Sequence, residues 1–237
     1  MWLNKEKTSA DAIAHYQKQL LQACPEYIVI DDLFNHSLLT EIAAALQQPD
    51  NWQSQRHTYA ELYVNDDQWN STKVQDRFVQ RDVFAYTDHH NAHVSSIAVA
   101  LLTFLRGPEF IAFLSRIFKV EITDINVEDP AVNTNYFRLS TKDFVAQHAD
   151  DSPGRKICLL LYLNQQWDED KGGELVFLGK ECFGQSNQHK TVEIAPLFNR
   201  CVMFNPSSKG SEHWVKALNT HYPDQYRYNI TSWYWSE

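Results

Sequence analysis

The sequence predicts a mostly β domain, with helices from the first half of the chain packed against one face of the β core. Apolar residues recur at helical spacing before Pro130, and this period disappears after it. Beyond Pro130, short apolar runs alternate with Gly, Asn, Pro and Asp, which is typical of an antiparallel sandwich or barrel. The 237 residues suffice for one sizeable domain with its own core. Helices followed by strands indicate that the helices cover one face of the sheet.

The expected helices lie in the first half. The predicted elements there are helices at residues 8–21 and 36–46, a buried strand at 27–30, and a helical stretch at 93–117. Ile13, Tyr16 and Leu20 follow the helical period and give the first helix one apolar face. Gly107-Pro108 interrupts the last stretch, and proline cannot sit in a helix interior without breaking a hydrogen bond. This stretch is therefore predicted as two helices.

The predicted domain organisation is simple. We expect a helical leader over residues 1–26 and one domain over 27–237, in which a helix-rich support (27–130) precedes a β core (131–237). Residues 49–91 are polar and aromatic without a period, so they are predicted to be irregular. Because long irregular segments in compact domains are often binding loops, we interpret this one as a substrate lid, with a passive loop as the alternative.

The second half is predicted as seven short strands. They cover residues 135–139, 156–163, 174–178, 191–195, 200–204, 213–218 and 226–235. Cys158 and Cys201 lie inside two of these apolar runs, and the four cysteines contain no C-x-x-C pair. Reduced, buried thiols are therefore expected at these two positions.

Charge and hydropathy exclude some classes of protein. The formal net charge is -9, whereas proteins that bind mainly through phosphates usually carry a basic surface. A nucleic-acid partner is therefore not expected. No apolar run is long enough to span a bilayer, and residues 1–7 lack the apolar stretch of a signal peptide. These features predict a cytoplasmic protein without a membrane partner.

Three residues suggest a metal centre. In an extended strand, residues i and i+2 point to the same face, so His148 and Asp150 would project together. His213 opens a later strand and offers a second imidazole. Two histidines and one carboxylate form the facial triad of non-haem Fe(II) sites, which leaves coordination positions open. Taken singly, a residue such as His148 is more often a surface histidine beside an acidic turn, and one such as His213 a structural histidine.

The last predicted strand contains an anion receptor. Alternation places Arg227, Asn229, Thr231 and Trp233 on one face. A guanidinium binds a carboxylate through two parallel hydrogen bonds, and a nearby hydroxyl adds a third. A local salt bridge of Arg227 is the alternative. His89, His90 and His93 are interpreted as solvated residues, and the glycines before Glu174 as a turn that opens a strand.

Residues 136–235 resemble the catalytic core of the 2-oxoglutarate and Fe(II)-dependent dioxygenases, specifically the prolyl hydroxylase branch with its prolyl 4-hydroxylases and its ribosomal and hypoxia-type members. The matching motifs, in chain order, are His148-Ala149-Asp150, Leu161–Trp167, Gly172–Phe177, Pro196–Phe204, His213-Trp214-Val215 and Arg227–Tyr234. The helical region before them is similar in layout but lacks sharp motifs. The resemblance implies a double-stranded β-helix, a jelly roll related to the cupins, with the N-terminal helices packed against it.

The resemblance also implies roles for nine residues. It assigns Fe(II) to His148, Asp150 and His213, and the distal carboxylate of 2-oxoglutarate to Arg227 and Thr231. The remaining implied pocket residues are Tyr162, which would hydrogen-bond that carboxylate, Leu175 and Trp233, which would line the pocket, and Tyr136, which matches a family tyrosine upstream of the His-x-Asp motif. Asn229 stands where many relatives have serine, and an amide still donates and accepts hydrogen bonds.

The implied activity is hydroxylation of an unactivated C–H bond with Fe(II), 2-oxoglutarate and O2, supported by ascorbate, and with release of succinate and CO2. The implied substrate is a prolyl residue in a protein or peptide, for example a component of translation. A hydroxylase of a free amino acid or small metabolite is an alternative. A nucleic-acid demethylase is disfavoured because Trp233 stands where that group has a second arginine. A catalytically silent jelly-roll binding module, with Zn in the triad, is the alternative outside enzymes.

Overall fold

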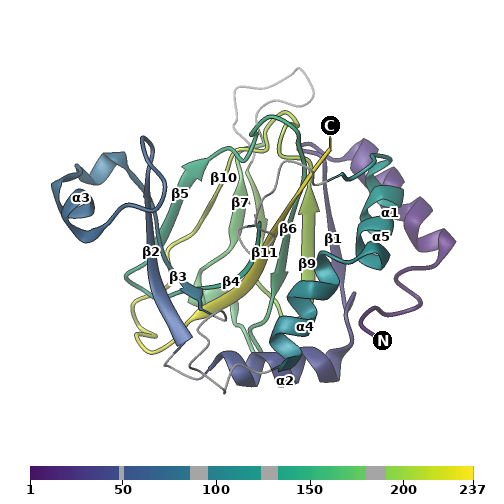
Figure 1. The fold of residues 1–237 in the computed structure, drawn as a ribbon, viewed down its shortest axis with the longest axis horizontal. Helices are drawn as coiled ribbons and strands as arrows, with labels where there is room; N and C mark the ends of the chain where they lie inside the picture. The colour runs from purple at the N-terminus through teal and green to yellow at the C-terminus, as the bar shows by residue number, and fades with distance from the viewer. Residues whose placement is uncertain (48–50, 86–95, 124–132, 180–190, 237) are drawn as a thin grey trace.

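The β-strands form one antiparallel array that folds back on itself as a jelly roll. The computed structural model describes residues 1–47, 51–85, 96–123, 133–179 and 191–236 (Figure 1). Its 11 strands follow the order β1-β9-β6-β11-β4-β3-β5-β10-β7-β8, with β2 paired to β3. The strands are β1 (Tyr27–Asp31), β2 (Trp52–Thr58), β3 (Arg77–Phe84), β4 (Thr134–Leu139), β5 (Phe144–His148), β6 (Arg155–Tyr162), β7 (Leu175–Phe177), β8 (Val192–Ile194), β9 (Arg200–Phe204), β10 (His213–Val215) and β11 (Arg227–Trp235). The predicted double-stranded β-helix is confirmed.

Helices cover one wall of the roll. They are α1 (Ala10–Gln22), α2 (His36–Leu46), α4 (Ser96–Leu105) and α5 (Pro108–Phe118), while α3 (Asp66–Ser71) lies at the opposite end beyond β2 (Figure 1). Short 3-10 turns occupy Val74–Asp76 and Glu169–Lys171. Ser9 caps α1 by accepting a hydrogen bond from the Ala12 amide, which satisfies one of the free N–H groups of the first turn. Gly107 separates α4 from α5, as the sequence predicts.

Two apolar clusters lie on the two faces of the helix-covered wall. Along β6, Ile157, Leu159 and Leu161 belong to the cluster beneath the helices, whereas Cys158 and Leu160 belong to the cluster inside the roll. Both faces of β6 are therefore buried, which explains its continuous apolar run. The helix-side cluster also contains the buried residues of α1, so the segment predicted as a leader packs into the same core as α2, α4 and α5.

The segment predicted as irregular contains regular structure. Residues 52–84 form the β2–β3 hairpin with α3 inserted in its connection, and residues 86–91 lie outside the described parts of the chain. The sequence of this hairpin shows no clear alternation of apolar and polar residues for two reasons. The pairing shifts register between His57 and Thr58, and the edge strand β2 has half-exposed polar residues on one face. The hairpin joins the roll through β3, which pairs with both β4 and β5.

The described cysteines include both free thiols and a disulfide-bonded residue. Cys158 and Cys201 are free and buried, as predicted. Cys24 is disulfide-bonded, an arrangement that the cysteine spacing did not predict. Among the described helices, none alone has the length and apolar character to cross a bilayer, although Ile97–Leu105 and Pro108–Phe118 pass that test as a pair bent by 43°.

Candidate metal centre and cosubstrate pocket

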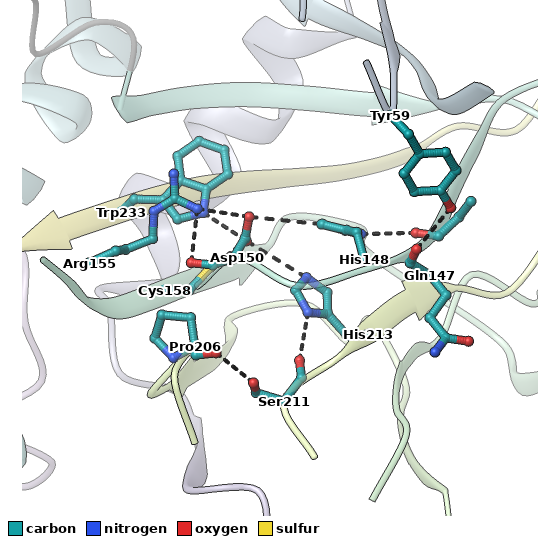
Figure 2. Close-up of polar contacts among 11 residues, drawn as sticks. Tyr59, Gln147, His148, Asp150, Arg155, Cys158, Pro206, Ser211, His213 and Trp233 are labelled. Carbon is teal, nitrogen blue, oxygen red and sulfur yellow. Dashed lines mark hydrogen bonds and ion pairs between the residues drawn. The ribbon is translucent and has the colours of Figure 1, made fainter. Parts of the chain in front are cut away.

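The structure brings His148, Asp150 and His213 together inside the mouth of the roll (Figure 2). His148 ends β5 and His213 begins β10, and the two residues are directly paired across these antiparallel strands. Nε2 of His148 lies 3.9 Å from Oδ1 of Asp150, and Nε2 of His213 lies 3.8 Å from Oδ2. One ligand atom from each residue lies within 4.8 Å of the other two. The three donors therefore surround one point, as a facial metal site requires.

The register shift between β5 and β10 orients the His148 side chain toward His213. Val215 pairs with Val145 and His213 with His148. Between these two pairs β5 therefore contains one residue more than β10, which is a β-bulge. Such a bulge turns the following side chain. It places the His148 ring beside that of His213, with the ring centroids 4.3 Å apart.

Backbone carbonyls fix the tautomer of both histidines. Nδ1 of His148 lies 2.9 Å from the carbonyl oxygen of Ala146, and Nδ1 of His213 lies 2.9 Å from that of Ser211. Because a carbonyl oxygen only accepts, each Nδ1 carries the proton and each Nε2 presents a lone pair toward Asp150. The hydroxyl of Ser211 in turn donates to the carbonyl of Pro206 (Figure 2).

Asp150 is held by three neighbouring side chains. The indole N–H of Trp233 donates to Oδ2 over 2.8 Å, and Arg155 donates to Oδ1 over 2.9 Å and to the backbone carbonyl over 3.0 Å. The Cys158 thiol lies 3.6 Å from Oδ2. Burial and the Asp150 charge raise the pKa of Cys158, so this sulfur remains a protonated donor rather than a competing thiolate ligand.

Electrostatics keep Asp150 and His213 in their metal-binding forms. Burial pushes the pKa of Asp150 upward, but the charges of the two histidines and Arg155, with the Trp233 hydrogen bond, lower it to about 2. Burial, together with His148, lowers the pKa of His213 to about 4. At neutral pH Asp150 is therefore ionised and His213 is neutral. A carboxylate with imidazole nitrogens suits Fe(II).

A second polar group lies deeper in the roll around Arg227. Its Nε donates to the carbonyl of Gly173 over 2.7 Å, and its Nη1 donates to Oδ1 of Asn229 over 2.8 Å. The Asn229 amide donates to the Thr231 hydroxyl over 2.9 Å. Cζ of Arg227 lies 4.8 Å from the centre of the Tyr162 ring. The expected anion receptor is thus held in place by protein contacts.

Two polar atoms in this group are buried without a partner among the described residues: Nη2 of Arg227 and the hydroxyl oxygen of Tyr162. Leaving such groups unpaired costs about 1–3 kcal/mol each, more for a charge. A carboxylate would satisfy both, and Thr231 still has a hydroxyl proton to give because Asn229 occupies its acceptor side. The residues present therefore fit the distal carboxylate of 2-oxoglutarate. Leu175 lies fully buried in the same interior cluster, where the pocket wall was expected.

Tyr136 does not reach this pocket. It pairs with Ile230, and both side chains belong to the helix-side cluster. Its hydroxyl donates to the carbonyl of Ala98 in α4 over 2.8 Å. The residue on the inner face is Phe137, because neighbours along a strand point to opposite faces. The expected pocket role of Tyr136 is corrected on this ground.

The sequence missed several supporting residues. Arg155 was passed over because it precedes the predicted strand, although its position five residues after Asp150 brings it back to that carboxylate. Cys158 alternates with Leu160 on the inner face of β6, so period-two spacing contained that signal. Gly173 acts through its carbonyl, which no side-chain pattern reveals. The cluster His89, His90 and His93 lies outside the described residues.

Comparisons with known proteins agree with this geometry. Residues 134–235 match the family model of the 2OG-Fe(II) oxygenase superfamily. The mouse (Mus musculus) prolyl 3-hydroxylase OGFOD1 is 26% identical over 137 residues, which cover 58% of this chain and 23% of the mouse protein. The chain therefore matches about a quarter of the length of that relative.

Solved structures of prolyl hydroxylases share the fold. The Trichoplax adhaerens prolyl hydroxylase, in complex with a hypoxia inducible factor oxygen degradation domain peptide fragment, has a TM-score of 0.63 at 20% identity, covering 97% of this chain and 91% of its own. The Pseudomonas putida prolyl-4-hydroxylase has a TM-score of 0.57 at 14% identity, covering 95% and 99%. Family model, curated relative and fold agree: residues 134–235 match the 2-oxoglutarate and Fe(II)-dependent oxygenases, and the chain is similar to members of their prolyl hydroxylase branch.

Proposed function

We propose that this protein hydroxylates a prolyl residue in a protein or peptide, with His148, Asp150 and His213 as the ligands of Fe(II). The observation that carries the proposal is the pairing of two incomplete sites in one roll. Three metal donors converge within 4.8 Å, and in the same roll the buried Nη2 of Arg227 and the buried hydroxyl of Tyr162 lack partners among the described residues. A metal together with a dicarboxylate chelator accounts for both.

Bound Fe(II), with 2-oxoglutarate and O2, supplies the oxidation of an unactivated C–H bond and releases succinate and CO2. The protein residues bind, orient and exclude water. Arg227 and Thr231 would hold the distal carboxylate of 2-oxoglutarate, and the Tyr162 hydroxyl would donate a hydrogen bond to the same group. Trp233 and Arg155 fix the orientation of Asp150, since each donates to a different carboxylate oxygen.

The apolar interior keeps solvent away from the reacting atoms. Leu160, Leu175, Phe177 and Val202 belong to the buried apolar cluster inside the roll. A dry, low-dielectric site strengthens the charge-assisted hydrogen bonds of Arg227 and protects a reactive oxidant from side reactions. The chain thus supplies placement, charge balance and exclusion of water.

The prolyl substrate is supported by the mouse relative and the two solved structures described above, which carry a prolyl hydroxylase name. Trp233 supports the same choice over a nucleic-acid demethylase, because its indole N–H is committed to Asp150 in the position where that group has a second arginine. A protein of the translation machinery, acted on in the cytoplasm, remains the proposed target.

The test uses the full chain with Fe(II), ascorbate and 2-oxoglutarate. Succinate release is expected from wild type and not from His213→Ala, while Trp2→Phe, a substitution on the distant helix side, retains it. Proteins from cells with and without the gene are then compared by mass spectrometry for a gain of one oxygen atom on proline. Oxygen gained by a metabolite, with unchanged proteins, would favour a small-molecule hydroxylase. Absence of succinate release would favour a silent binding module.

A further inference from the structure

The inner face of the β2–β3 hairpin carries a cluster of polar side chains that the proposed chemistry does not use. Gln55 pairs with Arg81 and His57 pairs with Val79, and directly opposed residues share a face. Arg81, His57 and Gln55 therefore project to the same side of the hairpin. Val79 also pairs with Val145 of β5, the strand that ends at His148.

This face looks into the roll beside the metal donors. The His57 and Phe78 rings are 5.7 Å apart, and the Phe78 and His148 rings are 5.6 Å apart. On the other side, the Arg81 guanidinium carbon lies 3.5 Å from the centre of the Phe137 ring. Phe137 pairs with Asn229, the residue that holds Arg227. Arg81 therefore lies between the metal donors and the cosubstrate receptor.

Arg81 is a partly buried cation that forms no ion pair with any carboxylate in the described parts of the chain. Its Nε donates to Oε1 of Gln55 over 2.8 Å, and Phe137 supports the face of the guanidinium. By contrast, Arg56 on the other face of the same hairpin pairs with Asp66. Burial lowers the pKa of Arg81 to about 10, although the charge of Asp150 acts in the opposite direction, so Arg81 stays charged at neutral pH. A partly buried cation that no described carboxylate contacts directly is stabilised by a ligand that brings one.

His57 adds a neutral donor on the same face. The backbone N–H of Tyr63 donates to its Nδ1 over 3.1 Å, so the ring proton resides on Nε2. Burial, with the charges of Arg81 and His148, lowers the pKa of His57 to about 4, and the ring is neutral at physiological pH. His57 as a whole residue is only 4% exposed. The cluster therefore offers N–H donors from Arg81 and His57.

We propose that Arg81, with His57 beside it, binds a carboxylate carried by the substrate. This inference rests on the proposed function and specifies its substrate class. A guanidinium forms two parallel hydrogen bonds with a carboxylate, and the cosubstrate carboxylate already has Arg227. The substrate carboxylate has two sources, an acidic side chain next to the target proline or the terminal carboxylate of a proline unit.

The test measures binding to the protein loaded with Fe(II) and 2-oxoglutarate under argon, where turnover cannot occur. The ligands are matched acid and amide pairs: proline peptides with Asp or Asn directly before or after the proline, and N-acetyl-L-proline with its amide. Wild type is expected to bind the acid of at least one pair about tenfold more tightly than its amide, as for a charge-assisted hydrogen-bonded pair. The pair that shows the preference identifies the source of the carboxylate.

Arg81→Gln is expected to abolish the preference for the acid over the amide. Arg81→Lys keeps the positive charge but lacks the planar guanidinium, so it should retain part of this preference. Arg56→Gln removes the same charge from the opposite face of the hairpin and should leave the preference intact. Equal affinity of acid and amide in every wild-type pair, including binding of neither, would overturn the proposal. So would an undiminished preference in Arg81→Gln, or a weakened affinity for 2-oxoglutarate alone.

A separate readout distinguishes this proposal from the proposed function. Admitting oxygen to the same samples and measuring hydroxyproline by mass spectrometry tests the prolyl reaction. An acid preference that depends on Arg81 but produces no hydroxyproline supports the carboxylate site and contradicts the prolyl assignment. Hydroxyproline formed equally from acid and amide partners, with equal affinities, supports the prolyl assignment and contradicts the carboxylate site.

Discussion

The indole N–H of Trp233 and the carboxylate of Asp150 form a 2.8 Å hydrogen bond across the mouth of the roll. Trp233→Phe removes this bond while keeping an aromatic ring in place. Residues that orient metal ligands typically change metal affinity 10- to 100-fold, so we expect the Fe(II) dissociation constant to rise at least about tenfold. Anaerobic Fe(II) titration measures this change, with Trp2→Phe as the matched control. An unchanged dissociation constant would show that Arg155 alone is enough to orient Asp150.

Gly173 allows Arg227 to approach the cosubstrate pocket. A Cβ added at this position would lie 2.9 Å from Cδ of Arg227 and 3.3 Å from Cζ2 of Trp167, and the glycine has a φ of +78°. Gly173→Ala should therefore displace the guanidinium and raise the KM for 2-oxoglutarate about tenfold, which corresponds to about 1.4 kcal/mol. Arg227→Ala should raise it further. Fe(II) affinity is the internal control, and its loss in either variant would contradict a role confined to the cosubstrate.

His57 makes stability depend on pH. Its pKa is about 4 when folded, against 6.5 when unfolded, so only the unfolded chain takes up a proton between these values. Its contribution is complete above pH 6.5 and is lost as the pH falls toward 4, by roughly 3 kcal/mol in total. Urea unfolding of the metal-free protein across this range should show a shallower loss for His57→Leu. Identical slopes would show that the ring is protonated in the folded state.

Asn199 stabilises the start of β9 through its side chain. It is fully buried, its backbone has a φ of +58°, and its amide exchanges hydrogen bonds of 3.1 and 2.8 Å with the N–H and carbonyl of Phe34. Asn199→Ala should lower the free energy of unfolding by about 2–4 kcal/mol, since it adds backbone strain to two lost bonds. Asn199→Gly relieves the backbone strain, so its loss of unfolding free energy should be about 1 kcal/mol smaller than that of Asn199→Ala. Chemical denaturation of both variants measures this difference. Equal losses would mean that backbone conformation contributes nothing.

Periodicity predicted the parts of the fold that bury a full face. The strands ending at Phe204 and Trp235 and the break at Gly107 follow from local patterns of apolar residues. The β2–β3 hairpin could not be predicted in this way, because its register shift and half-exposed faces remove the alternation of apolar and polar residues. In the site, side-chain chemistry identified the metal donors and Arg227, since few residue types can do these tasks.

Placement across strands was harder to predict. Tyr136 and Phe137 are both aromatic, and only the register against Ile230 and Asn229 determines which of them faces the roll. Arg81 gave no signal because its role depends on its position beside Phe137 and on the lack of a direct ion pair with the described carboxylates, which are properties of the folded protein. Contacts made by the backbone, such as the carbonyl of Gly173, carry no side-chain signal at all.

Strand β3 belongs to both walls of the roll, through Val83 with Phe137 on one side and Val79 with Val145 on the other. The wall that would meet a substrate is thus hydrogen-bonded directly to the strand that ends at His148. The hairpin face that carries Arg81 and the strand that presents a metal ligand are therefore parts of one continuous hydrogen-bonded sheet.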